Sequence, residues 1–233
     1  MDRKLLQNLT DQLEITPLVL CYYQQALTHS SYAHEHNLGS NAHNERLEFL
    51  GDAVLELAIS ESLYLRFPDF PEGKLTRFRA GLVCEESLTM LANQLYLGAC
   101  LRLGKGEAAS GGRQRPSLLA DAFEALLGAV YLDLGFDAVR KVVEKQFAPL
   151  LESLANGCLR HDYKTLMQEH SQAAFGTTPD YRIVSEQGPD HSKIFVAQLI
   201  LHGKVLGEGS GRSKKEAEQE AACQAYVSLM NAE

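Results

Sequence analysis

Three carboxylates lie on one edge of a single predicted helix. Glu45, Glu48 and Asp52 are spaced three and four residues apart in residues 44–55, so a helix makes their side chains neighbours. Like charges at this spacing repel one another weakly on an exposed helix and more strongly where water is excluded. A bound divalent cation would offset that repulsion. The segment therefore predicts a rigid helix that displays acids into a metal site.

A second pair of acids lies in residues 117–132, which are apolar nearly all round and predict a buried helix with Ser117 as its N-cap. Asp121 and Glu124 are three residues apart and share a face, and this segment contains no Lys or Arg to pair with them. Buried carboxylates are usually paired or bound to metal. All-oxygen ligation indicates Mg²⁺ or Mn²⁺. We therefore expect four acids to converge on one or two cations: Glu48, Asp52, Asp121 and Glu124.

The opposite edge of the first helix predicts how that helix is anchored. Four apolar residues on this edge are expected to pack into a core: Leu47, Leu50, Val54 and Leu57. An acid pair at helical spacing is more often a solvated face, and Glu48 with Asp52 alone would favour that interpretation. Three other acids are interpreted as solvated charges: Glu56, Glu61 and Glu144. The second, apolar helix makes the metal hypothesis the stronger one.

The composition is that of a globular protein. The 233 residues are 45% hydrophobic and 22% charged, enough for one large or two modest domains. We find no long apolar run and no signal-peptide core near the N-terminus, and so expect a cytoplasmic protein without a membrane partner. The five cysteines are scattered, without a Cys-x-x-Cys. This pattern indicates reduced, mostly buried thiols rather than disulfides or a zinc site.

The pattern along the chain changes near residue 155. Residues 1–155 indicate an all-helical domain, in which the Gly-rich residues 104–115 are expected to form a flexible surface loop. Residues 156–161 are interpreted as a linker, and residues 162–233 as a domain of α-β-β-β-α order. Its elements are predicted as a helix over 163–175, strands over 180–187, 194–201 and 204–208, and a helix over 214–230. This order predicts helices on one face of an antiparallel sheet.

The charge balance opposes nucleic-acid binding, since the chain has a net charge of −8. Residues 160–233 have 8 Lys and Arg against 10 Asp and Glu, a net charge of −2. Any nucleic-acid binding must therefore depend on local groups. Lys214 and Lys215, in the first turn of the last helix, oppose its macrodipole, which a phosphate there would offset. Three further candidates could reach grooves or 2′-hydroxyls, although a residue of this kind taken singly is more often solvated: Gln168, Gln172 and His191.

These motifs resemble bacterial ribonuclease III. Residues 44–55, Asn-Glu-Arg-Leu-Glu-Phe-Leu-Gly-Asp-Ala-Val-Leu, resemble the family's signature, and residues 119–128, Leu-Ala-Asp-Ala-Phe-Glu-Ala-Leu-Leu-Gly, resemble its second acidic motif. Residues 27–32 and 71–77 also fit. The C-terminal part is similar to a double-stranded RNA-binding domain, on the marks at 188–191 and 209–218. The resemblance covers nearly the whole chain.

The resemblance implies a homodimeric endonuclease that cleaves double-stranded RNA with Mg²⁺, for which Mn²⁺ can substitute. It implies 5′-phosphate and 3′-hydroxyl products, and ribosomal RNA precursors and structured messenger RNA as substrates. By match to the motif, the metal ligands are Glu48, Asp52, Asp121 and Glu124, and Glu45 and Glu72 lie near the catalytic valley.

Two other functions remain open at this point. The chain could be a non-catalytic regulator that binds double-stranded RNA, although the presence of all four acids disfavours this. It could also be a phosphohydrolase of small nucleotides. Its closely spaced histidines, His29, His34 and His36, lack the His-Asp spacing expected of such helical enzymes, and the C-terminal domain would then have no role.

Overall fold

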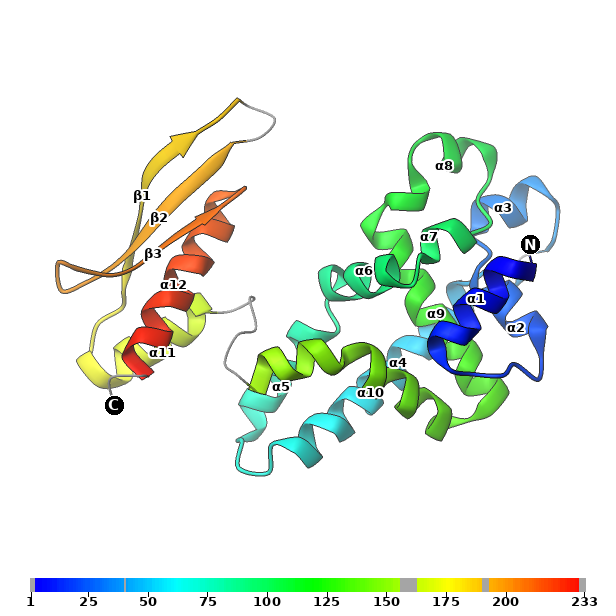
Figure 1. Cartoon of the computed structure of the whole chain (residues 1–233), viewed down its shortest axis with the longest axis horizontal. Helices are drawn as coiled ribbons and strands as arrows, with labels where there is room; N and C mark the ends of the chain where they lie inside the picture. Colours follow the sequence, from blue (N-terminus) through cyan, green and yellow to red (C-terminus); the bar gives the residue numbers. More distant parts are fainter. Residues whose placement is uncertain (1–2, 40, 156–162, 190–192, 231–233) are drawn as a thin grey trace. The chain divides into compact units, whose positions relative to one another are not determined.

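The computed structural model describes residues 3–39, 41–155, 163–189 and 193–230. The chain forms two compact units, residues 1–151 and 152–233, which Figure 1 shows coloured along the sequence. The predicted linker, 156–161, lies outside the described residues.

Every regular element of the first unit is a helix in the part of the chain that the structure describes. The elements are α1 (Arg3–Leu13), α2 (Leu20–Ala26), α3 (Ser30–Glu35), α4 (Glu45–Arg66), α5 (Glu72–Leu82), α6 (Glu85–Gln94), α7 (Leu97–Cys100), α8 (Lys105–Ala109), the short 3-10 helix η1 (Gly112–Gln114), α9 (Pro116–Leu134) and α10 (Phe136–Ala155). The predicted all-helical fold of this unit is confirmed.

Two glycines let α4 and α9 touch at their backbones. A Cβ atom on Gly51 of α4 would collide with the carbonyl oxygen of Glu124, and one on Gly128 of α9 would collide with the carbonyl oxygen of Leu47. Side chains therefore cannot separate the two helices at this crossing. The crossing places the acidic edge of α4 beside the two acids of α9.

The burial of these helices corrects two details of the sequence prediction. Leu47 and Val54 are buried as expected, but Leu57 is 56% exposed, because the side of α4 that packs on α9 is the side of Gly51. Helix α9 begins at Pro116 with Arg115 at the N-cap position, so Ser117 is not the cap. Proline suits the first helical position, where its missing N–H would have no partner in the helix.

The segment 104–115 is not the predicted flexible loop. It forms α8 and η1. Arg113 connects it to the preceding residues of the unit, and Arg115 forms an ion pair within the segment. Arg113 Nη1 donates hydrogen bonds to the carbonyl oxygens of Gly98 and Leu101, both at 2.8 Å. Arg115 pairs with Glu107 at 2.6 Å. The arginines that follow the glycines therefore give this segment a defined conformation.

The second unit confirms the predicted α-β-β-β-α order. Its elements are α11 (Tyr163–Phe175), β1 (Asp180–Gln187), β2 (Ile194–Leu201), β3 (Lys204–Gly211) and α12 (Lys214–Met230). The strands form an antiparallel sheet in the order β1-β2-β3. Helix α12, red in Figure 1, packs on β2 and β3 and also contacts α11.

Alternating glycines in β3 bring α12 close to the sheet. Cβ atoms on Gly207 and Gly209 would collide with the backbone of Ala221, and one on Gly211 would collide with Glu216. Small alanines complete this contact on the helix side, where Ala217, Ala221 and Ala225 are buried. Strand β3 runs three residues beyond the predicted end at residue 208 because this packing outweighs the poor strand propensity of glycine.

Most of the described cysteines are not buried. Cys100 is buried, Cys84 and Cys223 are half-buried, and Cys21 is exposed, which corrects the expectation of mostly buried thiols. Within the described residues, no helix combines the length and the apolar character that a membrane span requires.

Candidate active site

Three carboxylates from α4 and α9 meet at the helix crossing. One oxygen from each of Glu48, Asp121 and Glu124 lies within 4.8 Å of the other two. All three side chains are half-buried. The sequence predicts that four acids on two helices converge, and the structure brings three of the four together.

The electrostatics of Glu124 show how unfavourable this cluster is without a cation. Burial, followed by the charges of Asp52, Glu48 and Asp121, raises the pKa of Glu124 from 4.5 to about 8. A pKa near 8 means that the metal-free cluster holds a proton at neutral pH. A cation would favour the ionised form and displace this proton.

The other two members of the cluster are also perturbed. Burial raises the pKa of Glu48, followed by the charges of Asp121, Glu45 and Asp52. Burial also raises the pKa of Asp121, with Glu85 as the next cause. In both cases the carboxylate is destabilised by lost water and by neighbouring negative charge.

The remaining predicted acids lie outside the close cluster. Asp52 is exposed and is not one of the three converging groups, although its charge raises the pKa of both Glu48 and Glu124. Glu45 is the first residue of α4 and lies 3.8 Å from the imidazole of His43. Glu72 begins α5 and accepts a hydrogen bond from Thr76 at 2.8 Å. Within the described residues, the structure records no interaction of Glu72 with the cluster.

The sequence analysis missed three titratable groups near the cluster. Glu56, interpreted as solvated, is half-buried and contributes to the raised pKa of Glu124. Its position four residues after Asp52 was a signal for this. Glu85 begins α6 and raises the pKa of Asp121, whereas His29, the N-cap of α3, lowers it. Neither position has a local spacing that connects it with Asp121.

The donor set fits a hard divalent cation. Carboxylate oxygens are the ligands that Mg²⁺ and Mn²⁺ prefer. In the part of the chain that is described, none of Glu48, Asp121 and Glu124 pairs with a Lys or Arg side chain. Partly desolvated acids without a cationic partner are costly. The cluster is therefore a chemically suitable site for a metal ion.

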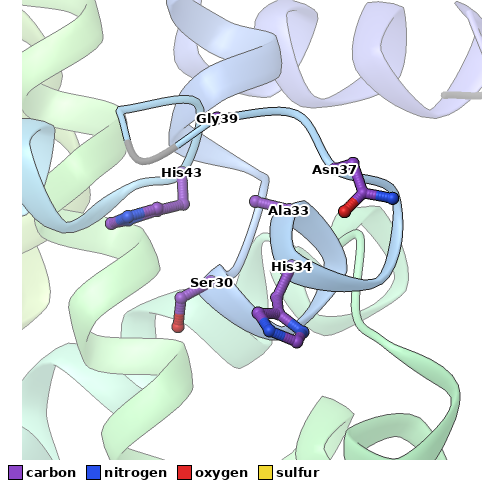
Figure 2. A pocket seen from close by; sticks show the side chains of 6 residues that line it. All are labelled: Ser30, Ala33, His34, Asn37, Gly39 and His43. Atoms are coloured by element: carbon purple, nitrogen blue, oxygen red, sulfur yellow. The ribbon is translucent and has the colours of Figure 1, made fainter.

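A separate cavity of about 340 Å³ lies beside α3. Its lining contains no carboxylate and consists of Ser30, Ala33, His34, Asn37, Gly39 and His43. Figure 2 shows the ring of His43 directed away from His34 and Asn37. The acid cluster therefore lies outside this cavity, and a cation held by carboxylates belongs at the α4–α9 crossing.

The predicted RNA-binding residues lie on two helices of the second unit. Gln168 and Gln172 are exposed on α11, and the Gln172 amide donates to the carbonyl oxygen of Gly176 at 3.4 Å. Lys214 and Lys215 are exposed in the first turn of α12. His191 lies outside the described residues.

The entry of α12 has a side-chain cap. The N–H of Glu216 donates to Ser213 Oγ at 3.1 Å. The Glu216 carboxylate accepts from the N–H of Arg212 at 2.6 Å, one residue before the cap itself. This variant of the capping box holds the chain that carries the two lysines.

Comparisons with known proteins agree with both units. Residues 22–151 match the family model described as Ribonuclease-III-like, and residues 163–229 match the Double-stranded RNA binding motif. Ribonuclease 3 of Desulforamulus reducens is 56% identical over 205 residues, 88% of this chain and 83% of that protein. Ribonuclease 3 of Pelotomaculum thermopropionicum is 54% identical over 203 residues, 87% of this chain and 84% of that protein.

A solved structure is similar to the first unit. The nuclease domain of ribonuclease III from Campylobacter jejuni is 37% identical, with a TM-score of 0.56 over 61% of this chain and 99% of that one. The description of that structure mentions a flexible region involved in dimer formation. Two family models, relatives matched over more than four fifths of their length and a converging acid cluster agree, and the chain belongs to the ribonuclease III family.

Proposed function

We propose that this protein is an endoribonuclease that hydrolyses double-stranded RNA with Mg²⁺, for which Mn²⁺ can substitute. The observation that supports this most directly is the convergence of Glu48, Asp121 and Glu124 to within 4.8 Å. The family supplies the reaction class, and the acid cluster supplies a place for the metal on which that reaction depends.

In this proposal, Glu48, Asp121 and Glu124 hold the metal directly, and Asp52 completes the set from the exposed edge of α4. A divalent cation held there would supply an activated water and would stabilise the oxygen that leaves the phosphodiester. Glu124 would release its proton to a bound cation, because its pKa of about 8 reflects burial and neighbouring negative charge, which a cation would offset. By match to the family motif, Glu45 and Glu72 lie near the catalytic valley of the dimer.

The second unit recognises the shape of the duplex. A-form RNA has a broad minor groove lined with 2′-hydroxyls and a narrow major groove bordered by phosphates. Gln168, Gln172 and His191 act in minor grooves, and Lys214 with Lys215 contacts the phosphates between them. The exposed position of these glutamines and lysines leaves their polar groups accessible to RNA.

The active form is a homodimer in which α4 supplies part of the interface. Phe49, Leu57 and Tyr64 are 82%, 56% and 72% exposed and fall on one stripe of α4. A second copy of this stripe, related by a twofold axis, would cover it and place two acid clusters so that both strands are cut. Sedimentation equilibrium tests this, and a mass of one chain at micromolar concentration would contradict it.

Cleavage leaves 5′-phosphate and 3′-hydroxyl ends, and the cellular role is the processing of ribosomal RNA precursors and structured messenger RNA in the cytoplasm. The test is incubation of a long end-labelled RNA duplex with the protein in Mg²⁺ or in EDTA, beside single-stranded RNA and double-stranded DNA. We expect cleavage of the RNA duplex with Mg²⁺ alone. Binding without cleavage, also in Mn²⁺, would instead support the non-catalytic regulator.

A further inference from the structure

One of the two lysines at the start of α12 already has an anionic partner. Lys214 Nζ lies 3.1 Å from Oε1 of Glu186, which belongs to β1. Both side chains are accessible, with Lys214 60% and Glu186 41% exposed. Among the described residues, the neighbouring Lys215 forms no such pair.

The position of Glu186 is fixed by the sheet. Glu186 pairs with Phe195 in the register of β1 and β2, and Lys214 Nζ lies 5.7 Å from the centre of the Phe195 ring. The sheet thus offers the ammonium group a carboxylate and an aromatic face in one place. The same unit pairs Lys164 with Glu218 at 2.7 Å, so acids offset its lysines at more than one point.

We propose that Glu186 limits the affinity of the protein for double-stranded RNA by competing with phosphate for Lys214. This inference rests on the proposed function, in which Lys214 contacts the RNA backbone. Residues 160–233 have a net charge of −2, so acids outnumber the lysines and arginines that could contact phosphate. RNA binding at this point is an exchange of one anion for another.

The exchange has two measurable consequences. Breaking an exposed ion pair offsets part of the free energy gained from the new phosphate contact, and such pairs are individually weak. Removing Glu186 should therefore strengthen binding by about two- to five-fold. Without Glu186, Lys214 is unpaired in the free protein, so its contact with phosphate releases a full counterion from the RNA. The slope of log K against log salt should therefore become steeper by up to about one unit.

The experiment measures binding of the full-length protein to a labelled RNA duplex in EDTA, which prevents cleavage, over a range of salt concentrations. Wild type is compared with Glu186→Gln and with Glu208→Gln. Glu208 is a matched control because it lies in the same sheet, is exposed, and accepts a hydrogen bond from Gln198 rather than from a lysine. The gain and the steeper slope are expected for Glu186→Gln and not for Glu208→Gln.

A double-mutant cycle with Lys214→Gln separates competition from general repulsion. If Glu186 acts through Lys214, adding Glu186→Gln to Lys214→Gln should increase RNA affinity by no more than Glu208→Gln does in the wild-type protein. An equal gain in both backgrounds, or no gain in wild type, would overturn the inference while the duplex binding itself remained. A wild-type protein that fails to bind duplex would instead overturn the proposed function, and the inference with it.

Discussion

Two contacts in this molecule use glycine to bring backbones together, but they display opposite kinds of charge. At the α4–α9 crossing, Gly51 and Gly128 place half-buried carboxylates beside one another. At the β3–α12 contact, Gly207 and Gly209 support a helix whose first turn presents Lys214 and Lys215 to solvent. The first contact concentrates like charges, and the second leaves its cations accessible to solvent.

This difference in charge indicates how each region binds its ligand. The acid cluster is destabilised by its own charges, as the raised pKa of Glu124 indicates, and a cation relieves that cost. Lys214 is already paired with Glu186 and must exchange partners. Removing an acid should therefore have opposite effects in the two regions, with a large loss of activity at the crossing and a modest gain of affinity at the sheet.

The largest expected effect is that of Glu124→Gln. Glutamine keeps the size of the side chain but cannot supply the anionic oxygen, so cleavage of an RNA duplex in Mg²⁺ should fall by more than about 100-fold. Duplex binding in EDTA should change little. Glu144→Gln, an exposed acid on α10, is the matched control and should leave cleavage unchanged. If Glu124→Gln turned over within a few-fold of wild type at saturating Mg²⁺, Glu124 would not be a ligand of the catalytic metal.

The next effect tests the helix crossing itself. A methyl group at Gly51 would collide with the backbone of α9, so Gly51→Ala should destabilise the protein by about 1–3 kcal/mol and should reduce cleavage as the acids separate. The control is Gly81→Ala in α5, where a Cβ meets nothing within 4 Å. It should be neutral or slightly stabilising because alanine favours helix. Thermal denaturation with parallel cleavage assays measures both variants, and a Gly51→Ala protein as stable as wild type would contradict the tight crossing.

Much of the fold follows from local pattern. The predicted bounds of α11, β1, β2 and α12 match the structure, because alternation, periodicity and turn residues mark these elements strongly in the sequence. The convergence of Glu48 with Asp121 and Glu124 was also predictable. In an apolar helix without Lys or Arg, two acids require a partner from elsewhere in the molecule.

What could not be predicted depends on contacts between distant elements. Nothing local connects Gly51 with Gly128, yet their contact decides which side of α4 is buried and leaves Leu57 exposed. Glu85 and His29 influence Asp121 from other helices. The Gly-rich segment 104–115 was interpreted as flexible because its anchors, the carbonyl oxygens that accept from Arg113, are apparent only in three dimensions.

A third prediction uses pH to test the strain in the acid cluster. The pKa of Glu124 is about 8 in the folded protein, against an ordinary value of 4.5. Between pH 4.5 and pH 8 the folded protein therefore binds more protons than the unfolded chain. Its stability in EDTA should therefore fall as pH rises through this window. We expect a melting temperature a few degrees lower at pH 8 than at pH 5, a smaller difference in Glu124→Gln, and recovery at pH 8 on addition of Mg²⁺. Equal pH dependence of the two melting temperatures in EDTA would show that the pKa of Glu124 is not raised in the folded protein.

The smallest effect separates two adjacent lysines. Lys215→Ala should lower the slope of log K against log salt by about one unit, because a solvated ammonium that binds phosphate releases a full counterion. Lys214→Ala should lower it by less, since in the free protein Lys214 is paired with Glu186. Lys204→Ala, an exposed lysine at the start of β3, serves as a control for the loss of positive charge alone. Identical slopes for the two α12 variants would mean that the ion pair has no influence on binding. Unchanged slopes in both variants would mean that neither lysine contacts phosphate. The exposed cations of α12 would then have no role in binding the RNA that the acid cluster is proposed to cleave.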